Sequence, residues 1–460
     1  MNIASSHTNI LKFKDEVRDE LLLDLKRIKH DDLLSDLQVE EQLQNLISWL
    51  SSTPKNTVFR VNTILCEQQV AYNCIIESLN EKYPESMLSV TTFSNIPELI
   101  IVKSCMYPKE LDLTKEPNEI IVDTACGSAV LRGSHIYAPG VLGMPRGLNI
   151  GDSVSVYVDL KQACKRGLVK LYDDESKLFI GNGIVKMMRE QIFCHDNSSC
   201  SGIAIIMTDT ISCIPQLNEK ILPKGHLLLQ NLPSIICSRI LDPQPGEIIL
   251  DMCAAPGNKT THIAALMNNK GIVIALEKIK NKLEKLNSNI ESFFATNVKT
   301  FCYDSTKVVC ESKDTCISNG PPFAAESFDR ILLDGPCSAL GQRPQLRNSI
   351  SVYQLRSYVP LQRKLFSMAF ELLKPGGTLV YSTCTITVAE NEGIIAWALK
   401  AFPKLELQCV REKLTSLNVG VFGTMGYNID GLTVEQSKNL WRLGCESDFV
   451  GFFIACFIKR

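Results

Sequence analysis

From residue 225 to the end, the sequence alternates short apolar segments with longer amphipathic ones, and this alternation constrains the fold more than any other feature. The apolar segments include EIILDMCAAPG, GIVIALEK, FDRILLDGPC and GTLVYSTCT, and helical patterns such as NKLEKLNSNIESF separate them. Such alternation predicts an α/β fold built on a doubly wound, largely parallel sheet. We place this domain at residues 215–460, with the apolar segment 451–458 as a buried strand.

Two regions with other patterns precede this sheet. Residues 1–50 carry apolar residues at helical spacing, and the stretch that follows has a strand, a helix and a second strand. We therefore expect a small N-terminal α/β segment over residues 1–112. Residues 113–214 are rich in glycine, β-branched residues and turn signals, which predicts an inserted β-rich domain of strands and turns.

Composition narrows the possible settings of the protein. The 460 residues carry a net charge of −2, so any nucleic-acid binding must use a local basic patch. The N-terminus lacks a secretory apolar core and no apolar run is long enough to cross a membrane, so we expect a cytoplasmic protein whose 18 cysteines are mostly reduced. Cys194, His195 and Cys200 are too few for a zinc motif, and we predict no metal site.

The residues at the predicted strand ends are chemically unusual. In a doubly wound sheet, ligands bind beyond the carboxyl ends of the strands. Those ends carry Asp251–Lys259, Glu277, Asp304, Asp334–Cys337 and Ser382–Cys384. Their convergence predicts one site at this edge of the sheet.

The turn DMCAAPGNKT at 251–260 has the small residues and the helix start that a nucleotide-like ligand needs. Glu277 ends the next strand, where its carboxylate can accept hydrogen bonds from ribose hydroxyls, and Asp304 ends the third, where it can accept from an adenine amine. An ordinary tight turn and routine turn acids are the alternatives. This pattern fits either an adenosyl methyl donor or a dinucleotide, although the turn is not G-x-G-x-x-G.

Two cysteines indicate the reaction. Cys337 lies in DGPCS after the fourth strand and Cys384 lies in YSTCT after the fifth, so adjacent strands place both thiols over one pocket beside Asp334. A thiolate that adds to carbon 6 of cytosine makes carbon 5 nucleophilic enough to accept a methyl group. A base must then remove the carbon 5 proton, and a carboxyl group can steady the ring. Two buried core cysteines are the alternative.

Several motifs resemble the Sun-domain family of RNA cytosine-5 methyltransferases. They are DMCAAPG, RILLDGPCSALGQRP, PLQRKLF and LLKPGGTLVYSTCTITVAENE, with FRVNT upstream. The run EIIVDTACGSAVLRGSHIYAPGVLG resembles a PUA RNA-binding domain. The resemblance implies a Rossmann-like class I methyltransferase with an inserted PUA domain, as in PUA-containing members that modify tRNA near the 3′ end of the acceptor stem.

The resemblance also implies residue roles. Cys384 is the expected nucleophile, Cys337 assists proton removal or enzyme release, Asp334 contacts the base and Lys259 orients the pocket. The residues expected to bind S-adenosylmethionine are Cys253, Ala254, Ala255, Pro256, Gly257, Asn258, Lys259, Glu277, Asp304 and Asp334. Two positions depart from the family pattern: Asn258 stands where a second glycine is usual, and Gly335 where alanine is common.

Expected RNA contacts lie in the PUA-like region. Arg132, Tyr137, Lys165 and Arg166 stand at positions that the PUA-containing members use for RNA, where cations hold phosphates and tyrosine stacks on a base. The expected partner is tRNA, gripped at its CCA end. The sequence leaves mRNA hairpins open as further substrates and indicates no obligate protein partner.

Two other functions compete with this hypothesis. A NAD-dependent oxidoreductase accounts for the sheet and Glu277, but gives Cys337 and Cys384 no task. A catalytically silent RNA-binding adaptor is also possible in principle, and intact Asp334, Lys259 and both cysteines argue against it.

Overall fold

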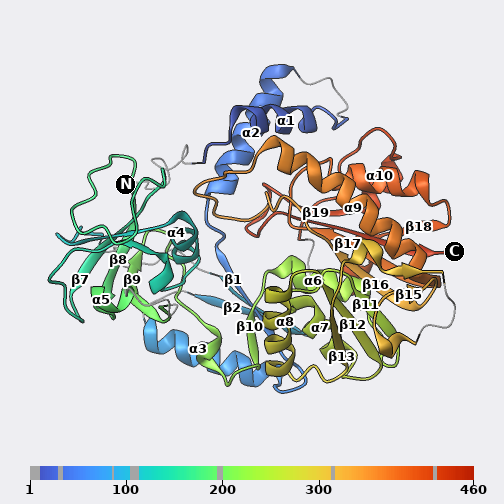
Figure 1. Cartoon of the computed structure of the whole chain (residues 1–460), viewed down its shortest axis with the longest axis horizontal. Coiled ribbons are helices and arrows are strands. Elements are labelled where there is room, and N and C mark those ends of the chain that lie inside the picture. The colour runs from blue at the N-terminus through green and yellow to red at the C-terminus, as the bar shows by residue number, and fades with distance from the viewer. Residues whose placement is uncertain are drawn as a thin grey trace.

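The computed structural model describes residues 11–29, 35–84, 88–103, 113–193, 200–311, 316–417 and 422–460. Within them, strands form an eight-stranded, a six-stranded and a four-stranded sheet, with a small two-stranded pair (Figure 1). The architecture is α/β, as predicted.

The eight-stranded sheet follows the order β13-β12-β11-β16-β17-β20-β18, with β19 paired to β20. The first five strands run parallel, whereas β20 is antiparallel to β17, β18 and β19. The predicted doubly wound, largely parallel sheet is therefore confirmed. Its strands are β11 (Ile248–Asp251), β12 (Ile272–Glu277), β13 (Val298–Cys302), β16 (Phe328–Asp334), β17 (Leu373–Thr383), β18 (Leu405–Gln408), β19 (Trp441–Leu443) and β20 (Phe452–Lys459).

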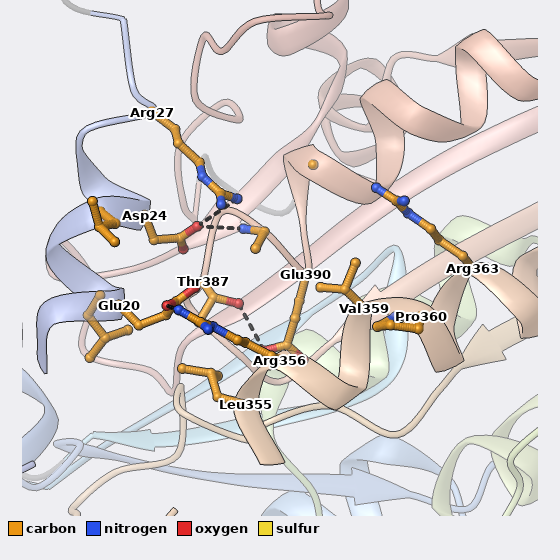
Figure 2. Close-up of a pocket in the computed structure, with 14 residues that line it drawn as sticks. Glu20, Asp24, Arg27, Leu355, Arg356, Val359, Pro360, Arg363, Thr387 and Glu390 are labelled. Atoms are coloured by element: carbon orange, nitrogen blue, oxygen red, sulfur yellow. Dashed lines mark hydrogen bonds and ion pairs between the residues drawn. The ribbon is translucent and has the colours of Figure 1, made fainter. Parts of the chain in front are cut away.

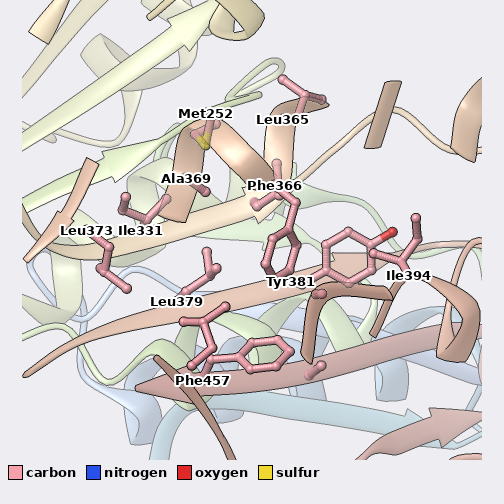
Figure 3. Close-up of a cluster of buried hydrophobic side chains, with 14 of the residues drawn as sticks. Met252, Ile331, Leu365, Phe366, Ala369, Leu373, Leu379, Tyr381, Ile394 and Phe457 are labelled. Atoms are coloured by element: carbon pink, nitrogen blue, oxygen red, sulfur yellow. The ribbon is translucent and has the colours of Figure 1, made fainter. Parts of the chain in front are cut away.

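Helices cover both faces of this sheet because its strands are apolar on both sides. Leu250, Ile331 and Leu379 face one layer, where they share a core with residues of α9 and α10. Figure 3 shows Ile331 and Leu379 beside Leu365 and Phe366 of α9. Their chain neighbours Ile249 and Leu332 face the other layer, which contains α6, α7 and α11. The helices of this region are α6 (Leu232–Leu241), α7 (Asn258–Leu266), α8 (Lys280–Ser292), α9 (Val352–Leu372), α10 (Glu392–Ala401), α11 (Val410–Ser416) and α12 (Val434–Asn439), and the small pair is β14 (Val309–Cys310) and β15 (Phe323–Ala324).

The six-stranded sheet follows the order β5-β9-β8-β7-β4-β6. Its elements are β4 (Glu119–Val122), α4 (Thr124–Leu131), β5 (Ile136–Tyr137), β6 (Val141–Gly143), β7 (Ser153–Val158), β8 (Leu178–Val185), α5 (Arg189–Ile192) and β9 (Ile203–Thr210). The expectation of strands and turns alone was wrong at α4. The Asp123 carboxylate caps this helix by accepting from the Cys126 N–H at 2.7 Å, and Gly127 lets it approach Val158 closely.

The four-stranded sheet joins distant parts of the chain. It contains β1 (Asn56–Val61), β2 (Ser89–Phe93), β3 (Ile96–Lys103) and β10 (Leu227–Leu229) in the order β10-β1-β3-β2, with α3 (Gln68–Lys82) packed against it. The chain thus leaves through β3, builds the six-stranded sheet, and returns through β10 to the other side of β1.

Two long-range contacts bind these layers together. Helices α1 (Asp15–Leu25) and α2 (Asp36–Ser51) share an apolar cluster with Leu340, Leu355 and Ile386 beside α9 (Figure 1). The loop between β16 and α9 crosses to the six-stranded sheet, where Leu346 is 3% exposed within its core. Arg347 in the same loop donates to the Leu160 carbonyl at 3.3 Å.

Candidate active site

The carboxyl ends of β11, β16 and β17 surround one cavity of about 230 Å³. Because these strands are neighbours and parallel, the turns that follow them meet at one edge. The lining residues are Asn231, Ser234, Asp251, Cys253, Ala254, Ala255, Pro256, Asn258, Lys259, Asp334, Gly335, Cys337, Gln342, Cys384 and Phe452.

The two cysteines meet at this cavity. The Sγ atoms of Cys337 and Cys384 lie 3.3 Å apart, although the residues are 47 positions apart in the chain. The hydrogen bond between them lowers the pKa of Cys384 and raises that of Cys337 well above its usual range. Of the two thiols, Cys384 therefore ionises more readily.

Asp334 ends β16 beside the thiols. Its Oδ2 accepts from Lys259 Nζ at 2.6 Å and its Oδ1 accepts from Ser382 Oγ at 2.6 Å. Burial opposes the charge on Lys259, yet the Asp334 carboxylate holds the pKa of that ammonium above its usual range. Lys259 is therefore a permanent cation, and Asp334 is held in one orientation from two sides.

Buried residues hold the turn after β11 in place. Asp251 is 1% exposed, and burial raises its pKa to about 6 although it accepts from Thr260 Oγ1 at 2.7 Å. Gly257 has φ +102°, and a Cβ there would lie 2.7 Å from Leu286. The left-handed position is thus Gly257, whereas Asn258 opens α7 as a helical residue. An asparagine in place of the second glycine needs no unusual backbone here.

The FRVNT motif anchors this turn to the four-stranded sheet. Arg60, 1% exposed, donates to the Asn258 carbonyl and to Thr261 Oγ1, the latter at 2.8 Å. Asn62 donates to the carbonyls of Gly225 and Phe293 at 3.0 and 2.9 Å. The motif therefore positions the first turn of α7 from outside the eight-stranded sheet.

The remaining predicted cofactor residues lie at the same edge but outside the cavity lining. Glu277 Oε1 accepts from the Ile279 N–H at 2.8 Å, and Asp304 accepts from Lys278 Nζ at 2.9 Å. The contact with Lys278 lowers the pKa of Asp304 to about 2, so that carboxylate stays charged. Gly257 shapes the turn and does not line the cavity.

The four predicted RNA residues lie on or beside the six-stranded sheet in different settings. Tyr137 is 49% exposed and Lys165 is exposed as well. Arg166 donates to the carbonyls of Pro139 and Val141, both at 2.8 Å. Arg132 donates to the Arg343 carbonyl at 3.2 Å and so reaches the loop after β16.

Two expectations from composition concern metals and membranes. Cys194 and His195 lie outside the described residues, and the described part of the chain contains no group of three or more potential metal ligands. Among the described helices, none has the length and apolar character that crossing a membrane requires.

Sequence reasoning missed the side chains that hold the site together. Ser382 orients Asp334, and Ser338, Glu390 and Asn391 lie directly behind the thiols. The available signal was the run AENE at 389–392, which belongs to the motif that resembles the family but received no role.

The chain is similar to known methyltransferases over nearly its whole length. A family model described as 16S rRNA methyltransferase RsmB/F matches residues 238–456. The mouse (Mus musculus) protein named tRNA (cytosine(72)-C(5))-methyltransferase NSUN6 is 42% identical over 447 residues, covering 92% of this chain and 91% of the mouse protein. The human (Homo sapiens) protein of the same name is 41% identical over 451 residues, covering 93% of each.

A solved structure agrees with these matches. The crystal structure of NSun6 from Pyrococcus horikoshii with SFG, an S-adenosylmethionine analogue, has a TM-score of 0.70 and 26% identity, and covers 97% of this chain and 98% of that one. These similarities exclude both the NAD-dependent oxidoreductase and the catalytically silent adaptor. The chain belongs to the Sun-domain, or RsmB/F, family of RNA cytosine-5 methyltransferases, and its cofactor is S-adenosylmethionine.

Proposed function

We propose that this chain methylates carbon 5 of a cytosine near the 3′ end of the acceptor stem of tRNA. One observation carries the proposal: two thiols 3.3 Å apart share a cavity with a carboxylate and a cation. The names of the mouse and human relatives, which act on cytosine 72 of tRNA, support the substrate.

Cys384 is the proposed nucleophile. Its lowered pKa favours the thiolate, which adds to carbon 6 of cytosine and moves an electron pair to carbon 5. The Cys337 thiol keeps its proton at this stage because its pKa is raised. When Cys384 becomes a thioether, the coupling between the sulfurs ends and Cys337 can release its own proton to solvent. The Cys337 thiolate then accepts the carbon 5 proton, the double bond between carbons 5 and 6 re-forms, and Cys384 leaves as a thiolate.

Asp334 is the proposed contact to the cytosine ring. A carboxylate at this place accepts a hydrogen bond from the exocyclic amine and fixes the ring over Cys384. Lys259 and Ser382 hold both carboxylate oxygens, so Asp334 meets the base without reorganising. Preorganised groups of this kind stabilise charge that develops in the transition state.

The residues of the turn after β11 fit S-adenosylmethionine. Ala254 and Ala255 leave room at the cavity wall, and Gly257 supplies a left-handed backbone that admits no Cβ. The first N–H groups of α7 have no acceptor within their own helix and can receive a carboxylate. Glu277 and Asp304 stand at the next two strand ends for the ribose and adenine. When bound, the cofactor supplies a methyl group on a sulfonium.

The six-stranded region, residues 113–214, is the proposed PUA domain that grips the CCA end. Tyr137 and Lys165 are exposed on it and suit a base and a phosphate. Arg132 stands where this region meets the loop after Cys337. mRNA hairpins are a further substrate to test by bisulfite sequencing of total RNA.

Replacement of each thiol tests the division of labour. Cys384→Ala should abolish methylation and form no covalent RNA adduct, because addition comes first. Cys337→Ala should still add to the base, so that labelled RNA accumulates on the protein in a denaturing gel. Adduct with Cys384→Ala and none with Cys337→Ala would reverse the roles, and methylation by Cys384→Ala would exclude covalent catalysis by this residue.

A further inference from the structure

The segment Thr387–Val388–Ala389–Glu390–Asn391–Glu392 follows Cys384, and the mechanism above gives it no task. The side chains of Glu390, Asn391 and Glu392 are 0–1% exposed, so three consecutive polar residues are buried. Burial of a polar group is costly unless it is hydrogen-bonded, and the partners of these residues therefore show what the segment holds in place.

Glu390 holds the loop that carries Cys337. Its Oε2 accepts from the Ser338 N–H at 3.0 Å, and its Oε1 accepts from Ser338 Oγ at 2.6 Å. Gln362, 1% exposed on α9, donates to Glu390 Oε2 at 2.9 Å and to the Pro336 carbonyl at 3.0 Å. The residues before and after Cys337 are therefore both tied to one buried carboxylate.

Asn391 holds the loop that carries Cys384 in the same way. Thr383 Oγ1 donates to Asn391 Oδ1 at 2.5 Å, and Asn391 Nδ2 donates to the Thr385 carbonyl at 3.1 Å. These contacts lie on either side of Cys384. A hydrogen bond of 2.6 Å between Ser338 Oγ and Thr385 Oγ1 then joins the two loops directly.

Helix α1 supports the segment from outside. Figure 2 shows Asp24 pointing at the backbone of this segment and Thr387 bonded to Glu390. The Asp24 carboxylate, 6% exposed, accepts from the N–H groups of Val388 and Ala389, the latter at 2.9 Å. The segment is thus fixed on the side away from the thiols as well.

We propose that Glu390 and Asn391 are positioning residues that set the separation of the two thiols. Glu390 fixes the loop of Cys337, and Asn391 fixes the loop of Cys384. Neither residue lines the cavity, so each acts through the loop it holds. This inference rests on the roles proposed above for the two cysteines.

Two nearly isosteric variants test the proposal. Glu390→Gln replaces one carboxylate oxygen, which accepts from Ser338, by an amide NH₂ group that can only donate. Asn391→Asp removes the NH₂ group that donates to the Thr385 carbonyl. Each variant should lower kcat about tenfold or more, because the rate falls steeply when the reacting groups are displaced from their productive positions. The KM for tRNA and the affinity for S-adenosylmethionine should stay within about twofold of the unchanged protein. Glu390→Gln should accumulate covalent RNA as Cys337→Ala does, whereas Asn391→Asp should form the adduct slowly.

The matched control is Glu392→Gln in the same segment. Glu392 is equally buried but pairs with Arg442 at 2.6 Å and contacts neither thiol loop. Its replacement should lower the melting temperature and leave the kcat of the folded fraction near that of the unchanged protein. Equal loss of kcat in all three variants, scaled by folded fraction, would reduce the segment to a structural role and overturn the proposal.

A second measurement covers the case in which Glu390→Gln does not fold. Ser338→Ala removes one partly exposed hydroxyl that links Glu390 and Thr385. The pH midpoint of Cys384 alkylation by iodoacetamide, read by peptide mass spectrometry, should rise in this variant because Cys337 no longer faces Cys384 steadily. An unchanged midpoint together with unchanged kcat would refute the inference.

The cysteine variants run beside these assays separate the two proposals. If Cys384→Ala and Cys337→Ala behave as expected but Glu390→Gln and Asn391→Asp keep full kcat, the positioning role fails and the mechanism stands. If the cysteine variants behave otherwise, the mechanism itself fails.

Discussion

Two adjacent cations in the six-stranded region, Lys165 and Arg166, differ in their contacts within the protein. The resemblance to PUA-containing members predicted that Lys165 and Arg166 both contact RNA, where a cation can hold a phosphate. Both side chains are exposed, but Arg166 also donates to two carbonyls at 2.8 Å and lies over the Phe193 ring at 5.3 Å. The charge of a side chain shows that it can bind a phosphate. It does not show whether the side chain already donates hydrogen bonds to backbone carbonyls of its own domain.

Lys165→Ala and Arg166→Ala should therefore differ in their effects on tRNA binding and on stability. Lys165→Ala should weaken tRNA binding and reduce its salt dependence, because fewer counterions are released, with the melting temperature unchanged. Arg166→Ala should lower the free energy of unfolding by about 1 kcal/mol, because the carbonyls of Pro139 and Val141 lose their donor. Filter binding at several salt concentrations and thermal unfolding measure the two effects. A stable Arg166→Ala protein with weakened tRNA binding would restore its predicted RNA role.

At the scale of elements, local periodicity predicted most of the catalytic sheet, because apolar strands and amphipathic helices carry their own pattern. Helix α4 was missed since its glycine and β-branched residues favour strands, and the Asp123 cap decides the outcome. The apolar face of α1 was visible in the sequence, but its partner was not. Asp24 meets Val388, 364 positions away, and no local pattern encodes such a distance.

The contact of α1 with the segment after Cys384 predicts a pH dependence. Burial raises the pKa of Asp24 from its ordinary 3.8 to about 6, so the folded protein binds a proton that the unfolded chain has released. The stability from this group is complete below pH 4 and is lost as pH rises to about 6. The shift corresponds to about 3 kcal/mol at most.

Asp24→Asn removes this titration. The difference in free energy of unfolding between the variant and the unchanged protein should therefore increase in favour of the variant as pH rises from about 4 to about 6.5. Urea denaturation at several pH values measures this difference. A difference between the two proteins that is constant over this range would show that Asp24 does not titrate there.

For the whole molecule, the side chains that meet at the cavity could be predicted from the sequence, but the side chains that hold them in place could not. Strand ends of a parallel sheet converge by topology, which placed Asp334, Cys337 and Cys384 together from sequence alone. Arg60 and Glu390 act across sheets or between loops, and only the completed fold brings them to the site.

Arg60 connects the four-stranded sheet to the turn after β11, which we propose binds the cofactor. Arg60→Met should lower the free energy of unfolding by about 1–3 kcal/mol, because the Asn258 carbonyl loses a buried donor. It should also weaken the binding of S-adenosylmethionine, because the turn is held less firmly. Calorimetry and thermal unfolding measure both quantities. A double-mutant cycle with Thr261→Val should show non-additive effects, and strict additivity would mean that the contact at 2.8 Å carries no coupling.

The loop after Cys337 also limits how this protein can be recombined. It begins at Cys337, which lines the cavity, and reaches Leu346 inside the core of the six-stranded region. A chimaera that takes the catalytic sheet from one relative and the inserted region from another would split a single packing unit if it were cut at the strand boundaries. Domain exchange in this family therefore requires Leu346 and Arg347 to match the parent of the insertion, whereas Ser338 and Leu340 must match the parent of the catalytic sheet and of α1 and α2.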